Sequence, residues 1–225
     1  AVVYNSSATF YGHATFDSNS NKTVHVYYDQ GNSNKGTAIV GTVSGTGISF
    51  GSEANFTSSA VDVAFNCSFD PDNNKVLVVY RDGGSPYEGR AIVGTVSGTS
   101  ISFGTAVSTG NVWFCFRGIA YDTVNNQSVV MGSSSLDGGS TYASVAQTAT
   151  ISGTSVVWGD RNIFNSALID GDGAGNGAVY DSAANRVLIS YSARGSDSYD
   201  GKSVVYKAAF DNTVRGSTAG GATAI

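Results

Sequence analysis

The stretch GTAIVGTVSGTGISFGS at residues 36–52 decides the fold, because it returns almost unchanged as GRAIVGTVSGTSISFGT at residues 89–105. A looser copy, TYASVAQTATISGTSVVWGD, occupies residues 141–160. An aromatic residue followed by Asp keeps the same period, at Phe16-Asp17, Phe69-Asp70, Tyr121-Asp122 and Tyr180-Asp181. A repeat of about fifty residues is typical of propeller blades and solenoid coils, which copy one supersecondary unit along the chain.

Each copy is predicted to contain four β-strands. In the second copy a short strand at 64–70 ends at an Asp-Pro-Asp-Asn-Asn turn, and the apolar run KVLVVYRD follows at 75–82. The recurring Ser-Gly-Thr step, for example at 97–99, lies between two β-rich runs. A tight hairpin there needs a residue that tolerates a positive φ. No segment has the apolar period of a helix, so the sequence predicts an all-β protein.

Four antiparallel strands per repeat predict the blades of a β-propeller, whose ring protects the edges of its sheets. We expect one repeat-built β domain over residues 1–225. The expected units are approximately 10–62, 63–115, 116–174 and 175–225, the last completed by residues 1–9. In that arrangement residues 1–4 pair beside the C-terminal unit around residues 204–210. A β-sandwich and a fragment of a larger propeller are the alternatives.

Composition narrows the class of partner. Only 13% of the residues are charged and the formal net charge is -5, whereas proteins that bind nucleic acid concentrate Lys and Arg. No apolar run is long enough to span a membrane as a helix. A surface supplied mainly by Ser, Thr and Asn is typical of extracellular and viral β-proteins. We therefore expect no nucleic acid and no membrane insertion.

Cys67 and Cys115 are the only cysteines, too few for a disulfide framework. They lie on equivalent strands of neighbouring repeats, so one cross-repeat disulfide is the alternative to the favoured interpretation, two buried thiols.

One loop has a recognisable motif. Residues 135–142 read Ser-Leu-Asp-Gly-Gly-Ser-Thr-Tyr, which resembles the Asp box of sialidase-like propellers with Tyr142 in place of the usual Trp. The first two units keep the centre of the motif at Asp29 and Asp82. The resemblance implies that Asp29, Asp82 and Asp137 are structural, each carboxylate accepting backbone N–H groups of its own hairpin loop.

The repeat phrase following a Tyr-x-Asp-x-Gly loop resembles the repeat arrays of tail-fibre and other virion proteins of marine bacteriophages, over most of residues 10–160. The resemblance implies an adhesive, receptor-binding module at a virion surface or outside the cell. Its expected partner is a cell-surface glycan or another receptor, or other virion or filament subunits. A structural decoration or filament subunit without a small ligand is the main alternative.

A sialidase-like hydrolase is less favoured, and we expect no catalytic residues. The stretch Phe-Arg-Gly-Ile at 116–119 departs at Gly118 from the Phe-Arg-Ile-Pro motif of sialidases. Glu53 and Glu88 are the only glutamates. A glycoside hydrolase needs two carboxyl groups at a controlled separation, which Asp residues engaged in turns do not readily supply.

Candidate ligand contacts come from the strand before each aromatic-Asp pair, which lines the central channel of a propeller. The residues are Tyr11, His13, Asn66, Trp113 and Arg117. Aromatic faces stack on sugars, and Arg bridges hydroxyls or carboxylates. The alternative is that these aromatic residues belong to the core between blades.

The strongest metal candidate is the loop that contains Asp170, Asp172 and Asn176. Its oxygen-bearing side chains at alternate positions partly imitate a calcium loop. The loop lacks the bidentate Glu, so a plain Gly-rich loop is favoured. No other cofactor is expected.

Overall fold

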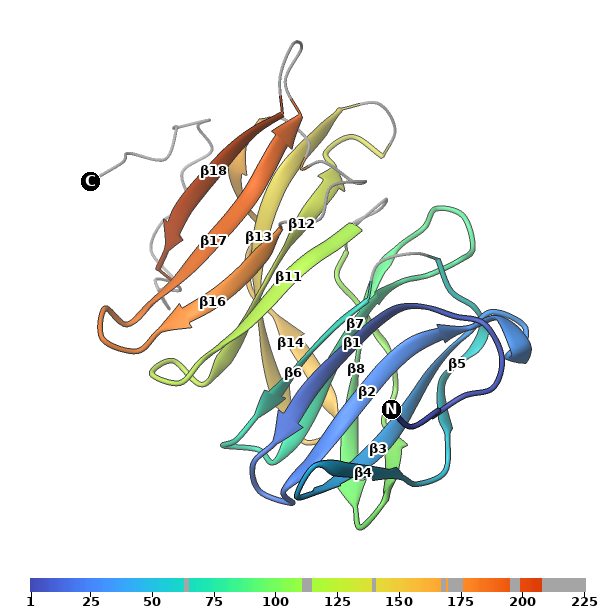
Figure 1. The fold of residues 1–225 in the computed structure, drawn as a ribbon. Helices are drawn as coiled ribbons and strands as arrows, with labels where there is room; N and C mark the ends of the chain where they lie inside the picture. Colours follow the sequence, from blue (N-terminus) through green and yellow to red (C-terminus); the bar gives the residue numbers. More distant parts are fainter. Residues whose placement is uncertain are drawn as a thin grey trace.

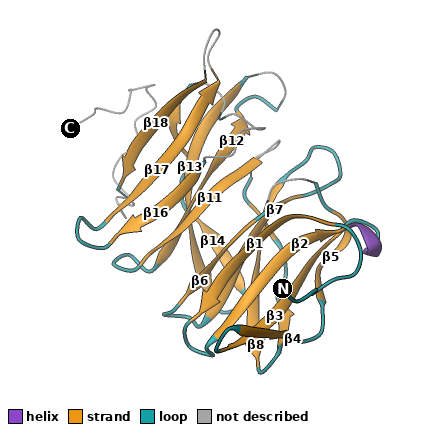
Figure 2. Ribbon diagram, in the orientation of Figure 1, coloured by secondary structure: helices purple, strands orange, loops and turns teal. Residues whose placement is uncertain are grey.

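The computed structural model describes residues 1–62, 65–110, 115–138, 141–166, 169, 176–194 and 199–207. These residues form β-strands joined by short turns, with one 3-10 helix at Gln30–Asn32. Four antiparallel sheets, one for each repeat, are arranged as the four blades of a β-propeller (Figures 1 and 2). The prediction of an all-β propeller built from four repeats is confirmed.

The blades follow one another along the chain. Blade 1 consists of β1 (Thr9–Asp17), β2 (Lys22–Asp29), β3 (Lys35–Ser44), β4 (Gly47–Phe50) and β5 (Ala54–Ala60). Blade 2 consists of β6 (Asn66–Asp70), β7 (Lys75–Arg81), β8 (Gly89–Ser97), β9 (Ser100–Phe103) and β10 (Val107–Ser108). Blade 3 consists of β11 (Cys115–Asp122), β12 (Gln127–Ser135), β13 (Tyr142–Ser152), β14 (Ser155–Trp158) and β15 (Asn162–Asn165). Blade 4 consists of β16 (Gly177–Asp181), β17 (Arg186–Arg194) and β18 (Tyr199–Tyr206). The first strands of successive blades, β1, β6, β11 and β16, lie side by side (Figure 1).

Blades 1–3 have one strand more than the four expected, because the expected fourth strand is divided in two. In blade 1 both β4 and β5 pair with β3. Between them the Gly51 N–H donates to the Val40 carbonyl at 2.9 Å. A Cβ on Gly51 would stand 1.9 Å from the carbonyl oxygen of Thr99, in the outer hairpin of blade 2. The division therefore occurs where the next blade approaches closely.

The outer hairpins have the expected turn chemistry. Gly45, Gly98 and Gly153 of the three Ser-Gly-Thr steps have φ values of +57°, +61° and +62°. These left-handed values confirm the prediction, since a residue with a Cβ is strained there.

The aromatic-Asp pair ends the first strand of each blade and closes the turn to the second. Asp70 Oδ1 accepts the N–H groups of Asp72 and Asn73 at 3.0 and 2.9 Å, and Asn74 has a φ of +51°. The same two-amide contact is made by Asp17, Asp122 and Asp181. The same Asp-closed turn thus joins the first and second strands of all four blades and recurs once in each repeat.

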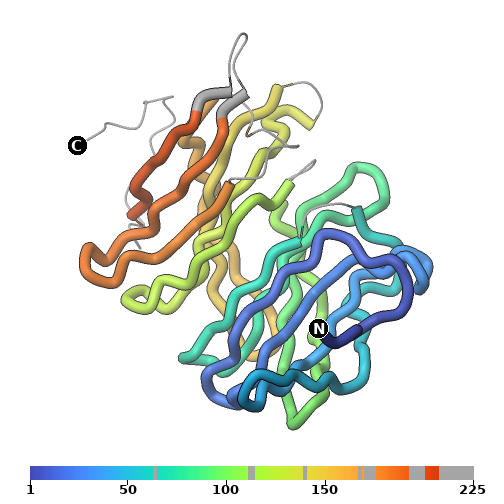
Figure 3. The backbone as a smooth tube through the Cα atoms, in the orientation of Figure 1, coloured from blue at the N-terminus to red at the C-terminus, as the bar shows by residue number. Residues whose placement is uncertain are grey.

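Hydrophobic side chains pack between neighbouring blades rather than within one blade. One cluster joins blades 1 and 2 around Val24 and Val78, a second joins blades 2 and 3 around Leu77 and Val130, and a third joins blades 3 and 4 around Met131. Among the described residues no fourth cluster joins blade 4 to blade 1. These two blades lie at opposite ends of the molecule in Figure 3.

Residues 1–4 do not form the expected pairing with the described part of the C-terminal unit, and residues 208–210 of the expected partner lie outside the described residues. Within the described part of the chain β18 pairs only with β17, and residues 1–7 form no strand. The Tyr4 ring instead packs on blade 1, with its centroid 5.0 Å from that of Tyr27 and 5.6 Å from that of Phe50. The N-terminal segment thus covers the aromatic face of blade 1 that points away from blade 2.

This covering predicts a pH-dependent stability. Burial lowers the pKa of His25, whose ring lies 5.3 Å from Phe50 and 6.0 Å from Tyr4, below its ordinary 6.5. On acidification the unfolded chain therefore binds a proton at a higher pH than the folded chain does. The contribution of His25 to the free energy of unfolding is fully present above pH 6.5 and is lost as the pH falls below it. Thermal melting at about pH 7.5 and about pH 5.5 should show a larger loss of Tm in the wild type than in His25→Gln.

Partial desolvation also lowers the pKa of His13, although part of its side chain is exposed on β1. The double variant His13→Gln/His25→Gln should therefore show the smallest loss of Tm on acidification. An equal loss in the wild type and both variants would show that the histidines do not carry the effect.

Candidate binding groove between blades 1 and 2

A groove with a volume of about 630 Å³ separates β5 of blade 1 from β7, β8 and β9 of blade 2. This volume lies within the range of roughly 300–1,000 Å³ that is usual for small-molecule sites. Its walls come from two repeats, so the groove exists only when both blades have folded against each other.

The floor of the groove is aromatic. The Phe56 ring of β5 lies 5.4 Å from Tyr80 and 5.7 Å from Phe103, both of blade 2. Phe56 and Tyr80 are buried, and Phe103 remains partly exposed. Burial raises the pKa of Tyr80 to about 12, an effect that Arg90 opposes and Asp82 increases. The floor therefore consists of the partly exposed Phe103 ring beside two buried rings, Phe56 and the neutral Tyr80.

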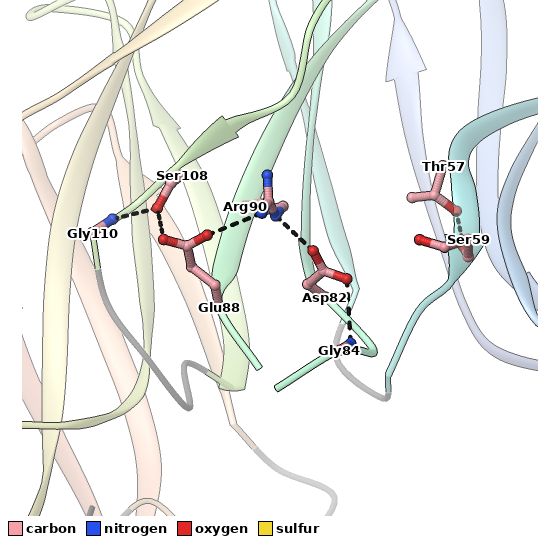
Figure 4. Close-up of polar contacts among 8 residues, drawn as sticks. All are labelled: Thr57, Ser59, Asp82, Gly84, Glu88, Arg90, Ser108 and Gly110. Atoms are coloured by element: carbon pink, nitrogen blue, oxygen red, sulfur yellow. Dashed lines mark hydrogen bonds and ion pairs between the residues drawn. The ribbon is translucent and has the colours of Figure 1, made fainter. Parts of the chain in front are cut away.

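One end of the groove is charged (Figure 4). Arg90 Nε lies 2.8 Å from Asp82 Oδ2, and Arg90 Nη2 lies 3.1 Å from Glu88 Oε2. Glu88 in turn accepts the Ser108 hydroxyl, which accepts the Gly110 N–H at 2.9 Å. The Asp82, Glu88 and Arg90 side chains are 29%, 26% and 33% exposed. The network holds the guanidinium in place and leaves it within reach of a ligand.

The opposite wall is lined by hydroxyl groups. Thr57 Oγ1 accepts the Gly36 N–H at 2.9 Å and donates to the Ser59 carbonyl at 2.9 Å, which ties the edge of β5 to β3. Ser58 and Ser59, and Ser102 on β9, line the groove and are exposed. The groove thus combines an apolar floor with hydroxyls along its rim.

The charged pair occurs in one repeat only. Asp82 follows β7, and Arg90 is the register partner of Tyr80 on β8. The equivalent pairs are Asp29 and Thr37 in blade 1, Ser134 and Val145 in blade 3, and Ala193 and Lys202 in blade 4. The other three blades form without the pair, so the blade fold does not require it.

One residue of this groove, Arg90, can be found by comparing the two nearly identical repeats, although it was not among the predicted binding residues. In the nearly identical copies 36–52 and 89–105, Thr37 is replaced by Arg90, the one change that introduces a charge. Phe56 and Phe103 were not identified, because nothing local shows that β5 of one repeat faces β9 of the next.

The expected channel residues lie on neighbouring inner strands. Tyr11 and His13 are on β1, Asn66 is on β6 and Arg117 is on β11. Tyr11 is 53% exposed at an irregularity of β1, with a φ of +55°. Asn66 is buried, and Arg117 Nε is buried without a hydrogen-bond partner among the described atoms. Trp113 lies outside the described residues, so a ligand role for this set stays a prediction.

The three Asp-box-like carboxylates have different partners. Asp137 Oδ1 accepts the Thr141 N–H at 3.1 Å, the loop contact that the resemblance implies. Asp82 Oδ1 accepts the Gly84 N–H at 3.4 Å and also faces Arg90. Asp29 Oδ2 accepts the Asn5 amide at 3.1 Å, from the N-terminal segment. Asp82 and Asp29 therefore also contact groups outside their own loops, Arg90 and Asn5.

The candidate calcium loop is largely outside the described residues, which include neither Asp170 nor Asp172. Asn176 is described, and its Oδ1 accepts the Ser192 N–H of β17 at 2.9 Å. Elsewhere in the described ranges no group of three or more His, Cys, Asp or Glu side chains is placed to hold a metal ion.

Both cysteines are free, and the cross-repeat disulfide is not formed. Cys67 is buried, and burial raises the pKa of its thiol to about 12. Cys115 is half-buried and accepts the Arg81 Nη1 donor at 2.6 Å.

A scan against protein-family models and a search of curated proteins find no match to this chain. Nor does the described part of the chain contain a helix long and apolar enough to cross a membrane.

Proposed function

We propose that this protein is an adhesion module that binds a cell-surface carbohydrate in the groove between blades 1 and 2, at a virion surface or outside the cell. The observation that supports the proposal is the Asp82–Arg90 pair. It is found in blade 2, at one end of a groove whose floor is aromatic.

The chemistry of the groove suits a sugar. A carboxylate beside a guanidinium can accept from one hydroxyl and donate to its neighbour. The partly exposed Phe103 offers an apolar edge to the C–H groups of a pyranose. Asp82 and Glu88 outnumber Arg90, so the charged end has an excess of negative charge. The preferred ligand is therefore a neutral sugar rather than an anionic one.

Binding is favoured over hydrolysis. Both carboxylates near the groove pair with the same guanidinium, whereas hydrolases place two carboxyl groups on opposite sides of the scissile bond. We expect the protein to hold its glycan without turnover.

Arg90→Ala should weaken glycan binding about 10- to 100-fold, because hydrogen bonds to a charged group contribute about 1.5–3 kcal/mol. The Tm should stay nearly constant, since the side chain is one-third exposed. A glycan array identifies the ligand, and calorimetry then measures its Kd for the wild type and the variant. Arg161→Ala is the matched control, an Arg of blade 3 that does not line the groove and whose guanidinium donates to the Ser134 hydroxyl at 3.4 Å and the Ser135 carbonyl at 3.3 Å.

A third variant, Arg117→Ala, separates the groove from the inner-strand channel. Loss of binding in Arg117→Ala with full binding in Arg90→Ala would move the site to the channel. Failure of the wild type to bind any glycan on the array would remove the adhesion function itself.

A further inference from the structure

The outward face of blade 4 has an exposed apolar row. Val179, Leu188 and Val205 are register partners across β16, β17 and β18, so their side chains lie on one face. They are 58%, 38% and 63% exposed. Figure 1 shows this sheet at the end of the molecule farthest from β4.

The other blades bury the same row. Leu188 is the third residue of β17, and the third residues of β2, β7 and β12 are Val24, Leu77 and Val129, each 0% exposed. Their partners on the next strand, Val40 and Val93 in blades 1 and 2, are also 0% exposed. In those blades the row packs against the following blade. Blade 4 therefore has the apolar row that the other blades use to pack on the next blade, but no described residues form a next blade against it.

The corresponding outer face of blade 1 is already covered. Tyr27 is 0% exposed there, beneath Tyr4. Asn5 of the same segment donates to Asp29 at 3.1 Å and to Glu53 at 2.8 Å, which fastens the segment to blade 1. A head-to-tail contact with another copy would have to displace this covering. The face of blade 4 is the one terminal face with its apolar row uncovered.

The residues beside the apolar row carry charges of both signs, so this face of one copy can pair with the same face of another. Asp181 and Arg186 are register partners in the adjoining row, and the exposed Lys207 directly follows β18, two residues beyond Val205. The row on the other side contains Ser190 and Ser203, both exposed. A two-fold axis exchanges the residues on either side of it and sets a residue on the axis against its own counterpart. An axis along β17 therefore sets Leu188 against Leu188 and brings Asp181, at the end of β16, toward Lys207, beyond β18 of the second copy.

We infer that this face binds a second copy of the chain, blade 4 to blade 4, in a two-fold dimer. The contact covers in both copies the row that the following blade covers in blades 1–3. It also leaves the groove between blades 1 and 2 free in each protomer, so the dimer presents two copies of that groove.

The experiment uses the full chain. Sedimentation equilibrium over about 1–200 μM should show a monomer–dimer equilibrium for the wild type. The double variant Leu188→Lys/Val205→Lys should be monomeric at every concentration, because it places like charges in an apolar contact. The matched control Val157→Lys, at a 60% exposed valine of β14, should dimerise as the wild type does. Circular dichroism at low concentration should give the same Tm for all three proteins.

A second variant tests the two-fold geometry directly. Leu188→Cys should form a disulfide-linked dimer on mild oxidation, and Val157→Cys should not. A wild type that stays monomeric over the whole range would overturn the inference, as would a monomer whose Tm drops in Leu188→Lys/Val205→Lys, since the chain itself would then cover the row. Assemblies that grow beyond the dimer would also overturn it.

Discussion

Gly51→Ala should lower the free energy of unfolding by about 3 kcal/mol, the upper part of the usual range for overpacking a filled site. The added Cβ would lie 1.9 Å from the Thr99 carbonyl oxygen and 2.9 Å from the Thr99 Cβ. Both atoms belong to the outer hairpin of blade 2, which cannot retreat without opening the cluster between blades 1 and 2. The measurement is urea denaturation followed by circular dichroism.

The matched control is Gly47→Ala in the same blade. Its Cβ would meet only the Ser44 carbonyl at 3.5 Å, an ordinary contact. Such a change stabilises by about 0.4–1 kcal/mol or has little effect, because it restricts the unfolded chain. Equal stability of Gly51→Ala and Gly47→Ala would show that the blades are not held as closely as this contact requires.

Asp70→Ala should cost about 3 kcal/mol, whereas Asp181→Ala should cost less than about 1 kcal/mol. Both carboxylates accept two backbone N–H groups in the same kind of turn. Asp70 is 1% exposed and also accepts the Asn73 amide at 2.9 Å, so its loss leaves several donors poorly solvated. Asp181 is exposed, and water can replace it.

The two variants compare a buried and an exposed copy of the turn that share the two backbone contacts and differ in burial and in the Asn73 amide. Denaturation is measured at low micromolar concentration, so that association through blade 4 does not contribute. Similar losses in the two variants would mean that the turn contacts act locally and that burial between blades adds nothing.

Residues close in the sequence were the predictable part of the candidate site. The Asp82 loop was identified from its motif, and Arg90 stands out when the two nearly identical copies are compared. The groove itself was not predictable, because Phe56 and Arg90 belong to different repeats and meet only through the packing of blade 1 on blade 2. The same limit applies to Tyr4, whose packing on Tyr27 replaced an expected pairing with the C-terminal unit.

The sequence by itself determined the four repeats, the antiparallel strands within each repeat, the left-handed glycines of the outer hairpins and the Asp-closed inner turns. These features depend on interactions between neighbours in the chain, so they are visible as residue types at constant spacing. The tertiary structure alone decided that the outermost strand divides at Gly51, that the N-terminal segment covers blade 1 and that blade 4 keeps Leu188 exposed. Each of these depends on which blade lies against which, and identical repeats encode the same faces whether or not a neighbour is present to bury them.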